Sequence, residues 1–225
     1  SHLIGRRVRE HNVYSEVVPY RITPEEINNL KKKYDIKGII FSGGPSSVYD
    51  ENAPKVDPEI LNMDVPVLGI CYGHQLIASM VGGTVEPAET KEYGIIYPEI
   101  IEEDALRKDL GKKEKAWTSH ADTVQKLTDD FEVLANTKNC PVASFSQKAK
   151  GIYGIQWHPE VTHTEHGDKV FQNFLFDICD CEAGWNLEDF ANNSVEKIKN
   201  TVDGEKCIIA ISGGIDSSTA AVLAS

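Results

Sequence analysis

The feature of this sequence that most restricts its fold is the alternation of short apolar runs with stretches of helical periodicity. Residues 38–42 (GIIFS) and 66–70 (PVLGI) have the length and composition of buried strands. Residues 23–34 begin with a Thr-Pro-Glu-Glu capping signal and place apolar side chains at helical spacing. This alternation is typical of βα units. We expect an α/β fold with a mainly parallel open sheet flanked by helices.

The middle of the chain changes pattern. Between residues 84 and 157, short strand-like pieces at 131–135, 142–145 and 152–157 are separated by polar turns. This pattern predicts a smaller antiparallel or mixed sheet extension. An amphipathic helix around residues 170–178 then closes a first domain, which we place at residues 1–183.

The C-terminal part predicts a connecting helix over residues 184–205, followed by a strand at 206–211, a loop and the start of a helix. The segment 206–225 is too short for a core of its own. We therefore expect it to open a larger, truncated domain. The N-terminus begins with a helical pattern, whereas a βα sheet ordinarily starts with a strand, so the first strand is expected to be missing.

Charge and composition exclude several classes of protein. The net charge of −12 over 225 residues is the wrong sign for general attraction to nucleic acid or anionic membranes. No apolar run approaches the roughly 20 residues of a membrane helix. The five cysteines are odd in number and have no CxxC spacing, which favours a reducing cytoplasm and no metal site.

The first chemical motif is GxCxG at residues 69–73, directly after a predicted strand and before a helix. In this pattern small residues allow a sharp turn that exposes a nucleophile at a helix N-terminus. The helix dipole there favours thiolate over thiol, so Cys71 is the candidate nucleophile. The alternative is an inert buried cysteine in a βα turn.

The second motif is His158-Pro159-Glu160, which follows the predicted strand around 152–155. A cysteine nucleophile needs a base that takes and returns a proton, and the base needs a group that fixes its tautomer. His158 and Glu160 suit these two roles because residues two apart can project to the same side. The alternative for His158 is a hydrogen-bonded structural histidine.

Two glycine-rich loops also follow predicted strands. The turn at 42–47 (SGGPSS) is either an ordinary tight turn or a source of one oxyanion donor, with the N–H of Tyr72 as the other. The loop at 212–218 lacks the GKS or GKT ending of a Walker A loop. Its N–H groups and hydroxyls at a helix N-terminus make it a candidate phosphate site. Its residues are Ser212, Gly213, Gly214, Ile215, Asp216, Ser217 and Ser218.

Together these motifs resemble the class I, triad-type glutamine amidotransferases, whose core is flavodoxin-like. The resemblance covers essentially the whole chain and extends to the segments 6–10 (RRVRE), 119–122 (SHAD), 158–164 (HPEVTHT) and 179–181 (CDC). The SGGIDSS loop is similar to the pyrophosphate-binding loop of the ATP pyrophosphatase family.

For the glutaminase half, the resemblance implies that Cys71 attacks the side-chain amide of glutamine, that His158 relays the proton and that Glu160 orients His158. A γ-glutamyl thioester and ammonia would result, with no cofactor. Ala121 stands where this family usually has glycine. The resemblance further assigns the oxyanion hole to Gly44 and Tyr72, and glutamine binding to Gln75 and the backbone around Ser119 and His120.

For the complete enzyme, the resemblance implies an ATP- and Mg²⁺-dependent synthetase domain that uses the ammonia to aminate XMP to GMP. It also allows a homodimer. One alternative is the amidotransferase of another synthetase, feeding CTP, carbamoyl phosphate or anthranilate synthesis. Two alternatives come from other classes of function. One is a non-catalytic docking module, and the other is a cysteine peptidase that presents its nucleophile on a similar sharp turn, called a nucleophile elbow.

Overall fold

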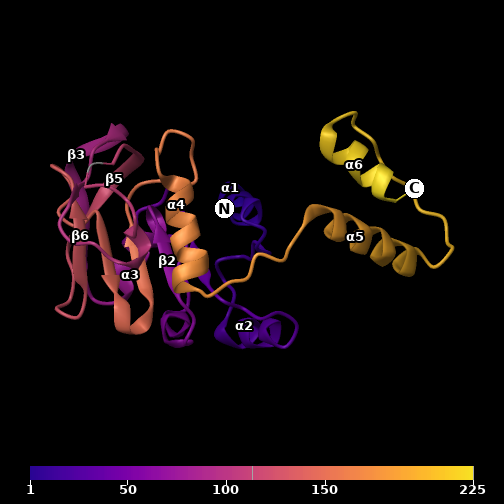
Figure 1. Cartoon of the computed structure of the whole chain (residues 1–225), viewed down its shortest axis with the longest axis horizontal. Coiled ribbons are helices and arrows are strands. Elements are labelled where there is room, and N and C mark those ends of the chain that lie inside the picture. Colours follow the sequence, from indigo (N-terminus) through magenta and orange to yellow (C-terminus); the bar gives the residue numbers. More distant parts are fainter. Residues whose placement is uncertain (113, 225) are drawn as a thin grey trace. The chain divides into compact units, whose positions relative to one another are not determined.

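A computed structural model describes residues 1–112 and 114–224 (Figure 1). Lys113 and Ser225, the last residue of the expected synthetase segment, lie outside the described residues. The chain divides into two compact units, Ser1–Glu182 and Ala183–Ser225. The helices are α1 His2–Glu10, α2 Pro24–Lys31, α3 Tyr72–Met80, α4 Gly167–Gln172, α5 Leu187–Val202 and α6 Ile215–Leu223, and a π-helical turn covers Asn173–Ile178. The strands are β1 Ile39–Phe41, β2 Val67–Ile70, β3 Thr84–Ile96, β4 Glu99–Ile100, β5 Ala116–Lys126, β6 Glu132–Asn136, β7 Ser144–Gln147 and β8 Ile152–Ile155.

Unit 1 is built on a six-stranded mixed sheet in the order β1-β2-β8-β7-β6-β4. β1, β2 and β8 run parallel, and the three remaining pairings are antiparallel. A separate two-stranded antiparallel sheet consists of β3 and β5. The expected α/β fold with an antiparallel extension is therefore confirmed.

The parallel part of the sheet is nevertheless smaller than the sequence pattern predicts. β6, β7 and β8 follow one another through the short connections 137–143 and 148–151, which lack the crossover helix that parallel neighbours ordinarily need. The chain between β1 and β2, with the 3-10 helix Pro58–Asn62, and the chain between β2 and β8, which includes α3, make the crossovers of the parallel strands. The parallel pairings are consequently confined to one side of the sheet.

The two faces of the sheet bury two separate cores. Along β2, Val67 packs on one face, while Leu68 and Ile70 point to the other, as the alternation of a strand requires. The first core includes residues of α2, α3 and β5, and the second includes residues of α1, α4 and the π-helical turn. The nucleophile segment at the end of β2 thus lies between two buried layers.

The predicted helix signals in unit 1 form as expected. Thr23 accepts a hydrogen bond from the backbone N–H of Glu26, and the Glu26 carboxylate accepts one from the backbone N–H of Thr23. The helix expected around 170–178 is present as α4 and the π-helical turn. Its buried apolar residues include Val170, Phe171 and Phe174, which anchor the chain after the His-Pro-Glu segment.

Unit 2 contains α5, capped by Asn186, and α6, joined by an irregular segment. The prediction of a strand at residues 206–211 is wrong, because these residues have no regular secondary structure. The described part of unit 2 contains no second strand to pair with them, and an unpaired strand leaves its backbone groups without partners. Ile208 is accordingly 98% exposed.

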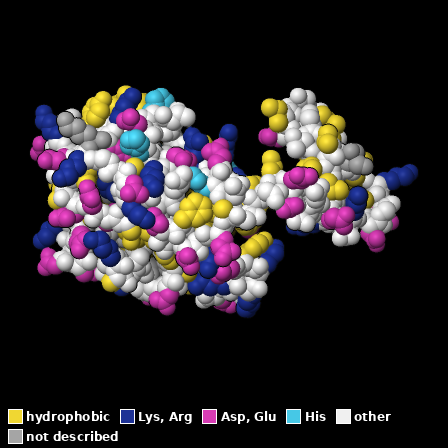
Figure 2. Space-filling model, viewed as in Figure 1, with side chains coloured by type: hydrophobic (Ala, Val, Ile, Leu, Met, Phe, Trp, Pro, Cys, Tyr) yellow, Lys and Arg dark blue, Asp and Glu magenta, His cyan; other side chains and the backbone are white. Residues whose placement is uncertain are grey.

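The charged side chains on the surface of unit 1 include both signs (Figure 2). On the face drawn in Figure 2, acidic and basic side chains are interspersed over unit 1. None of the described helices is both long enough and apolar enough to cross a membrane.

The contact between α3 and β1 allows no side chain at Gly73. A Cβ there would lie 2.2 Å from the carbonyl oxygen of Phe41, which is backbone and cannot rotate away. We expect Gly73→Ala to lower the free energy of unfolding by about 3 kcal/mol or more, because the strand and the helix must separate. The free energy of unfolding is measured by urea denaturation, with circular dichroism as the signal. The control is Gly184→Ala, where a Cβ meets nothing within 4 Å; equal stability of the two variants would contradict the packing argument.

Candidate active site

Cys71 occupies a strained turn between β2 and α3. Its φ is +54°, in the left-handed region that non-glycine residues seldom adopt. The turn is closely packed: a Cβ on Gly69 would lie 2.6 Å from the carbonyl oxygen of Gly73. The Cys71 N–H donates to the Ile155 carbonyl on β8 at 2.9 Å. The predicted elbow is present, and it places the sulfur at the start of α3.

His158 and Glu160 lie together after β8. The Nδ1 atom of His158 is 2.8 Å from Oε1 of Glu160. Both side chains are largely buried, with 17% and 11% of their area exposed. The proline between them stiffens the segment, so the carboxylate holds one ring nitrogen and leaves the other available.

The electrostatic surroundings favour a protonated His158. Burial alone would lower the pKa of this imidazole, but hydrogen bonding and charge from Cys71 and Glu160 outweigh burial and raise the pKa to about 10. The structure therefore brings Cys71, His158 and Glu160 into one interacting group. Such a group stabilises an imidazolium beside the sulfur.

A second histidine near Cys71 is chemically different. His74, on the buried face of α3, is fully buried, and its ring stacks on Phe145 with centroids 4.8 Å apart. Burial, reinforced by the nearby His120, lowers the pKa of His74 to about 3. His74 is neutral at physiological pH and belongs to the core.

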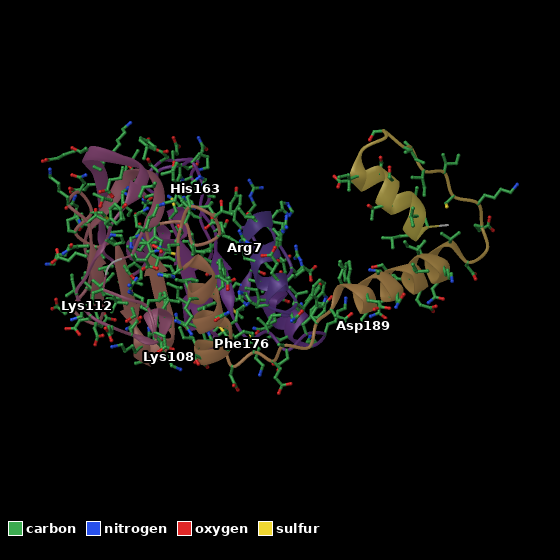
Figure 3. The ribbon with its side chains drawn as sticks, turned by 45° about the horizontal axis from the view of Figure 1, so that its top comes forward. Arg7, Lys108, Lys112, His163, Phe176 and Asp189 are labelled. Atoms are coloured by element: carbon green, nitrogen blue, oxygen red, sulfur yellow. The ribbon has the colours of Figure 1, made fainter. Side chains whose placement is uncertain are left out.

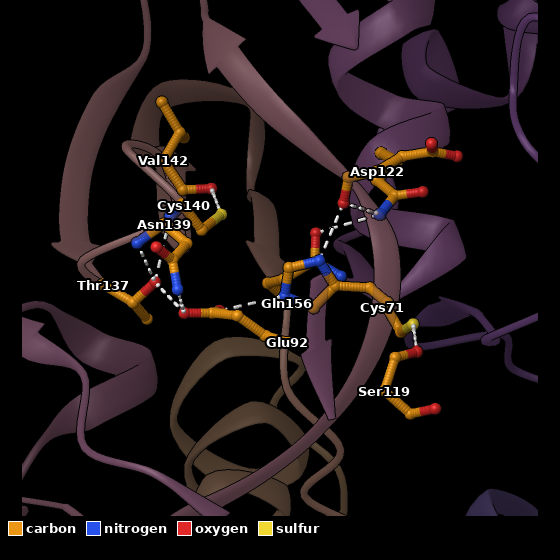
Figure 4. Close-up of polar contacts among 11 residues, drawn as sticks. Cys71, Glu92, Ser119, Asp122, Thr137, Asn139, Cys140, Val142 and Gln156 are labelled. Atoms are coloured by element: carbon orange, nitrogen blue, oxygen red, sulfur yellow. Dashed lines mark hydrogen bonds and ion pairs between the residues drawn. The ribbon is translucent and has the colours of Figure 1, made fainter. Parts of the chain in front are cut away.

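The Ser42–Gly44 turn and β5 flank the sulfur. A Cβ on Gly43 would lie 3.1 Å from Cε1 of His158 and 3.5 Å from Cβ of Cys71, so the turn lies directly against the group. On another side, the Cys71 thiol is 3.8 Å from the carbonyl oxygen of Ser119 (Figure 4). The turn and strand expected to bind the oxyanion and glutamine are thus both beside Cys71.

The other expected glutamine-binding residues join a buried polar network. Nε2 of Gln75 donates to the Asp122 carbonyl at 3.0 Å and to Oε1 of Gln156 at 3.1 Å. The His120 ring lies between the Asp122 carbonyl and Glu92, at 2.8 and 3.1 Å. Both ring nitrogens of His120 are thus within hydrogen-bond distance of protein partners.

Glu92 was not singled out in the sequence, and Asp122 was named only as part of the 119–122 segment, with no role. The Asp122 carboxylate accepts hydrogen bonds from Ser47 and Tyr49, at 2.5 and 2.7 Å, and so joins β5 to the chain after the Ser42–Gly44 turn. Glu92 is 8% exposed and also accepts from Thr137. The pairing of β3 with β5 and the contacts with Thr137 and Asn139 are long-range in sequence, so no local pattern predicts that Glu92 is buried.

The 212–218 loop lies in unit 2 and keeps its polar groups exposed. Ser217 Oγ accepts from the N–H of Ser212 at 3.2 Å and donates to the Gly214 carbonyl at 3.1 Å. Gly213 has a φ of +83°. α6 begins inside this segment, at Ile215, and its N-cap, Gly214, offers no side-chain hydrogen bond. N–H groups of this kind at a helix start suit an anion.

Comparison with known proteins shows the family to which the chain belongs. Residues 1–178 match the family described as Glutamine amidotransferase class-I. The chain belongs to the class-I glutamine amidotransferase family. The Cys71 turn, the His-Pro-Glu segment, the Ser42–Gly44 turn and β5 of this amidotransferase all lie within the matched residues. Among the described residues, no group of three or more His, Cys, Asp or Glu side chains could hold a metal ion.

Individual relatives extend the match beyond the family region. The chain is 48% identical over 221 residues to the "GMP synthase [glutamine-hydrolyzing]" of Caldanaerobacter subterraneus subsp. tengcongensis and equally to that of Bacillus anthracis. Each match covers 98% of this chain but 42% of the relative, so the chain spans about two fifths of the length of these proteins. The similarity therefore concerns one portion of a longer protein.

Solved structures agree with this fold. The crystal structure of a putative GMP synthase subunit from Thermoplasma acidophilum superposes with a TM-score of 0.71 at 31% identity, covering 80% of this chain and 87% of that one. A glutamine amidotransferase from Thermotoga maritima has a TM-score of 0.56 at 18% identity, covering 92% of this chain and 80% of that one. The second likeness concerns the fold alone.

The raised pKa of His158 predicts a defined pH dependence. A histidine whose pKa is raised from 6.5 to about 10 contributes stability that is complete below pH 6.5 and is lost as the pH rises through about 10. Glu160→Gln removes one of the two groups that raise this pKa. We expect the variant to titrate at lower pH than the wild type, as measured by NMR of ¹³C-labelled imidazole. An unchanged titration would contradict the role of the carboxylate.

Proposed function

We propose that this chain hydrolyses glutamine to glutamate and ammonia. The observation that carries the proposal is the interacting group of Cys71, His158 and Glu160, on a chain of the class-I amidotransferase family. A nucleophile, a base and an orienting carboxylate are the parts that covalent amide hydrolysis requires.

In the first step, the Cys71 thiolate attacks the side-chain amide carbon of glutamine and forms a C–S bond. The imidazolium of His158 gives its proton to the amide nitrogen, and the C–N bond breaks to release ammonia. Glu160 stabilises the charged imidazole through the 2.8 Å contact to Nδ1. The product of this step is a γ-glutamyl thioester on Cys71.

In the second step, water attacks the thioester and His158 takes a proton from it. The C–S bond breaks, so glutamate leaves and the Cys71–His158 pair returns to its starting state. Both steps pass through a tetrahedral oxyanion, for which we propose the N–H groups of Gly44 and Tyr72 as donors. Removing one such donor typically costs about 100-fold or more in rate.

Glutamine itself would be held beside this group by Gln75 and by the backbone of Ser119 and His120. Two observations support this placement. The Ser119 carbonyl is already the neighbour of the Cys71 thiol, and the side chains of Gln75 and His120 lie in the adjoining buried network around the Asp122 carbonyl.

For the whole protein we propose glutamine-dependent GMP synthesis, in which ATP activates XMP and ammonia displaces the activating group. The names and identity of the longer relatives support this reading over the other synthetases, a docking module or a peptidase. Residues 1–183 would be the glutaminase domain, 184–205 a connecting helix and 206–225 the opening of the synthetase domain. We further propose a cytoplasmic enzyme that uses Mg²⁺ and forms a homodimer.

The exposed 212–218 loop would bind the pyrophosphate part of ATP through its N–H groups and serine hydroxyls, which fit an anion. Bound ATP would supply the leaving group for amination. The role of the chain's own residues is to hold the phosphates at the start of α6.

The test offers the chain glutamine and, separately, peptide substrates, and measures ammonia and glutamate. Release of both from glutamine alone is expected; peptide cleavage would support a cysteine peptidase, and no turnover would support a docking module. In the full-length protein, Asp216→Ala should remove ATP-dependent amination and spare glutamine-analogue labelling of Cys71. Unchanged ATP turnover in that variant would overturn the placement of the ATP site.

A further inference from the structure

One strand, β5, touches both the proposed nucleophile and the proposed base. The Ser119 carbonyl is the neighbour of the Cys71 thiol, and the Trp117 carbonyl accepts the backbone N–H of His158 at 2.9 Å. Residues two apart on a strand direct their carbonyls to the same edge. The position of His158 along β5 therefore sets its position relative to Cys71.

A side-chain hydroxyl completes the attachment of His158 to this strand. Thr164 Oγ1 accepts a hydrogen bond from the Trp117 N–H at 3.0 Å and donates one to the His158 carbonyl at 2.5 Å. It thereby joins two backbone groups through one atom. Thr164 is 5% exposed, so water has little access to replace this hydroxyl.

The chain from His158 to Glu165, called here the 158–165 loop, returns to the same strand at its other end. The Glu165 N–H donates to the Lys115 carbonyl at 2.9 Å. In addition, the exposed His163 ring, labelled in Figure 3, packs at a tilt of 39° against the Trp117 indole, with centroids 4.7 Å apart. The loop is thus attached to residues 115 and 117 at the start of β5, and the Thr164 hydroxyl is the side-chain attachment that reaches His158 itself.

We propose that Thr164 is a positioning residue for His158, whose hydroxyl links the Trp117 N–H to the His158 carbonyl and so holds the imidazole at Cys71. This inference rests on the proposed function, because it gives His158 a reaction to perform. Thr164 does not touch the reacting atoms; it acts through the backbone of the base.

Removing this hydroxyl leaves a part-buried N–H and a part-buried C=O without their shared partner, so the loop must shift to find new ones. A misplacement of about 1 Å at a catalytic group costs on the order of 100-fold in rate. The glutamine-binding contacts proposed on Ser119 and Gln75 do not involve the loop. A loss in kcat with little change in KM is therefore the expected signature.

The variants are Thr164→Val, which keeps the shape without the hydroxyl, and Thr164→Ser, which keeps the hydroxyl. The matched control is Thr162→Val, the same substitution at an exposed position of the same loop. We expect Thr164→Val to lower kcat for glutamine by about 10- to 100-fold with KM within about 3-fold. Thr164→Ser and Thr162→Val should stay within about 3-fold of wild type.

A second readout does not depend on turnover. NMR titration of ¹³C-labelled His158 should give a lower pKa in Thr164→Val than in wild type, because the imidazole is held less well against Cys71 and Glu160. Near-UV circular dichroism tests whether each variant is folded. If Thr164→Val is not folded, Thr164→Ala takes its place.

Wild-type kcat and an unmoved His158 titration in a folded Thr164→Val would overturn the proposal. So would an equal loss in Thr164→Ser, since the hydroxyl would then be irrelevant. If the wild type does not hydrolyse glutamine but the Thr164→Val titration shifts and the Thr162→Val titration does not, the proposed function fails while the positioning of His158 by Thr164 stands.

Discussion

Cys71→Ala is expected to reduce glutamine hydrolysis at least about 10,000-fold, because it removes the atom that bonds to the substrate while leaving the fold in place. The thiol lies beside His158 and the Ser119 carbonyl, and a methyl group fits the same position. Ammonia release under saturating glutamine measures the effect. In the full-length protein, synthesis from added ammonium should persist, since the proposed synthetase site is separate.

The matched control for this variant is Cys140→Ala. Cys140 is as deeply buried as Cys71, but its thiol donates to the Val142 carbonyl at 3.3 Å. Burial raises the pKa of Cys140 to about 11, so it stays protonated and is a poor nucleophile. Hydrolysis should be retained in this variant. A comparable loss in both variants would mean that cysteine removal acts through stability and not through chemistry.

His158→Ala should lower kcat by a similar factor, because residues that act as one catalytic unit fail together when any essential member is lost. The double variant Cys71→Ala/His158→Ala is then expected to be no worse than either single one. The control is His166→Ala on the chain just after the 158–165 loop, where the side chain forms no capping hydrogen bond. Additive losses in the double variant would show that the two residues act independently.

The candidate catalytic residues could be proposed from the sequence because their motifs are local. A glycine on each side of Cys71 and a proline between His158 and Glu160 set the backbone within a few residues. The strand and helix patterns beside these motifs also depend on neighbouring residues. Local motifs of this kind can be recognised without knowing the tertiary structure.

The residues that surround the site were less predictable. Glu92 and Asp122 are buried by the pairing of β3 with β5 and by the chain after the Ser42–Gly44 turn, which meets β5 more than 70 residues away in sequence. Thr164 belonged to a recognised segment, yet its link between Trp117 and His158 depends on where β5 lies. Long-range pairing of this kind leaves no periodic signal.

The error at residues 206–211 has a related cause. An apolar run rich in Ile has the composition of a buried strand, but a strand forms only against a neighbour. The described part of unit 2 provides none. The parallel share of the main sheet was overestimated for a similar reason, because the direction of pairing depends on the connections and not on the composition of the strands.

The most direct test of the account is to treat the chain with a diazo ketone analogue of glutamine and to locate the adduct by peptide mass spectrometry. The analogue needs both an activated sulfur and a pocket that recognises glutamine, so it tests the nucleophile and the substrate together. The account predicts a single adduct on Cys71, prevented by excess glutamine. Labelling of Cys140 or Cys179 with Cys71 unmodified would contradict it.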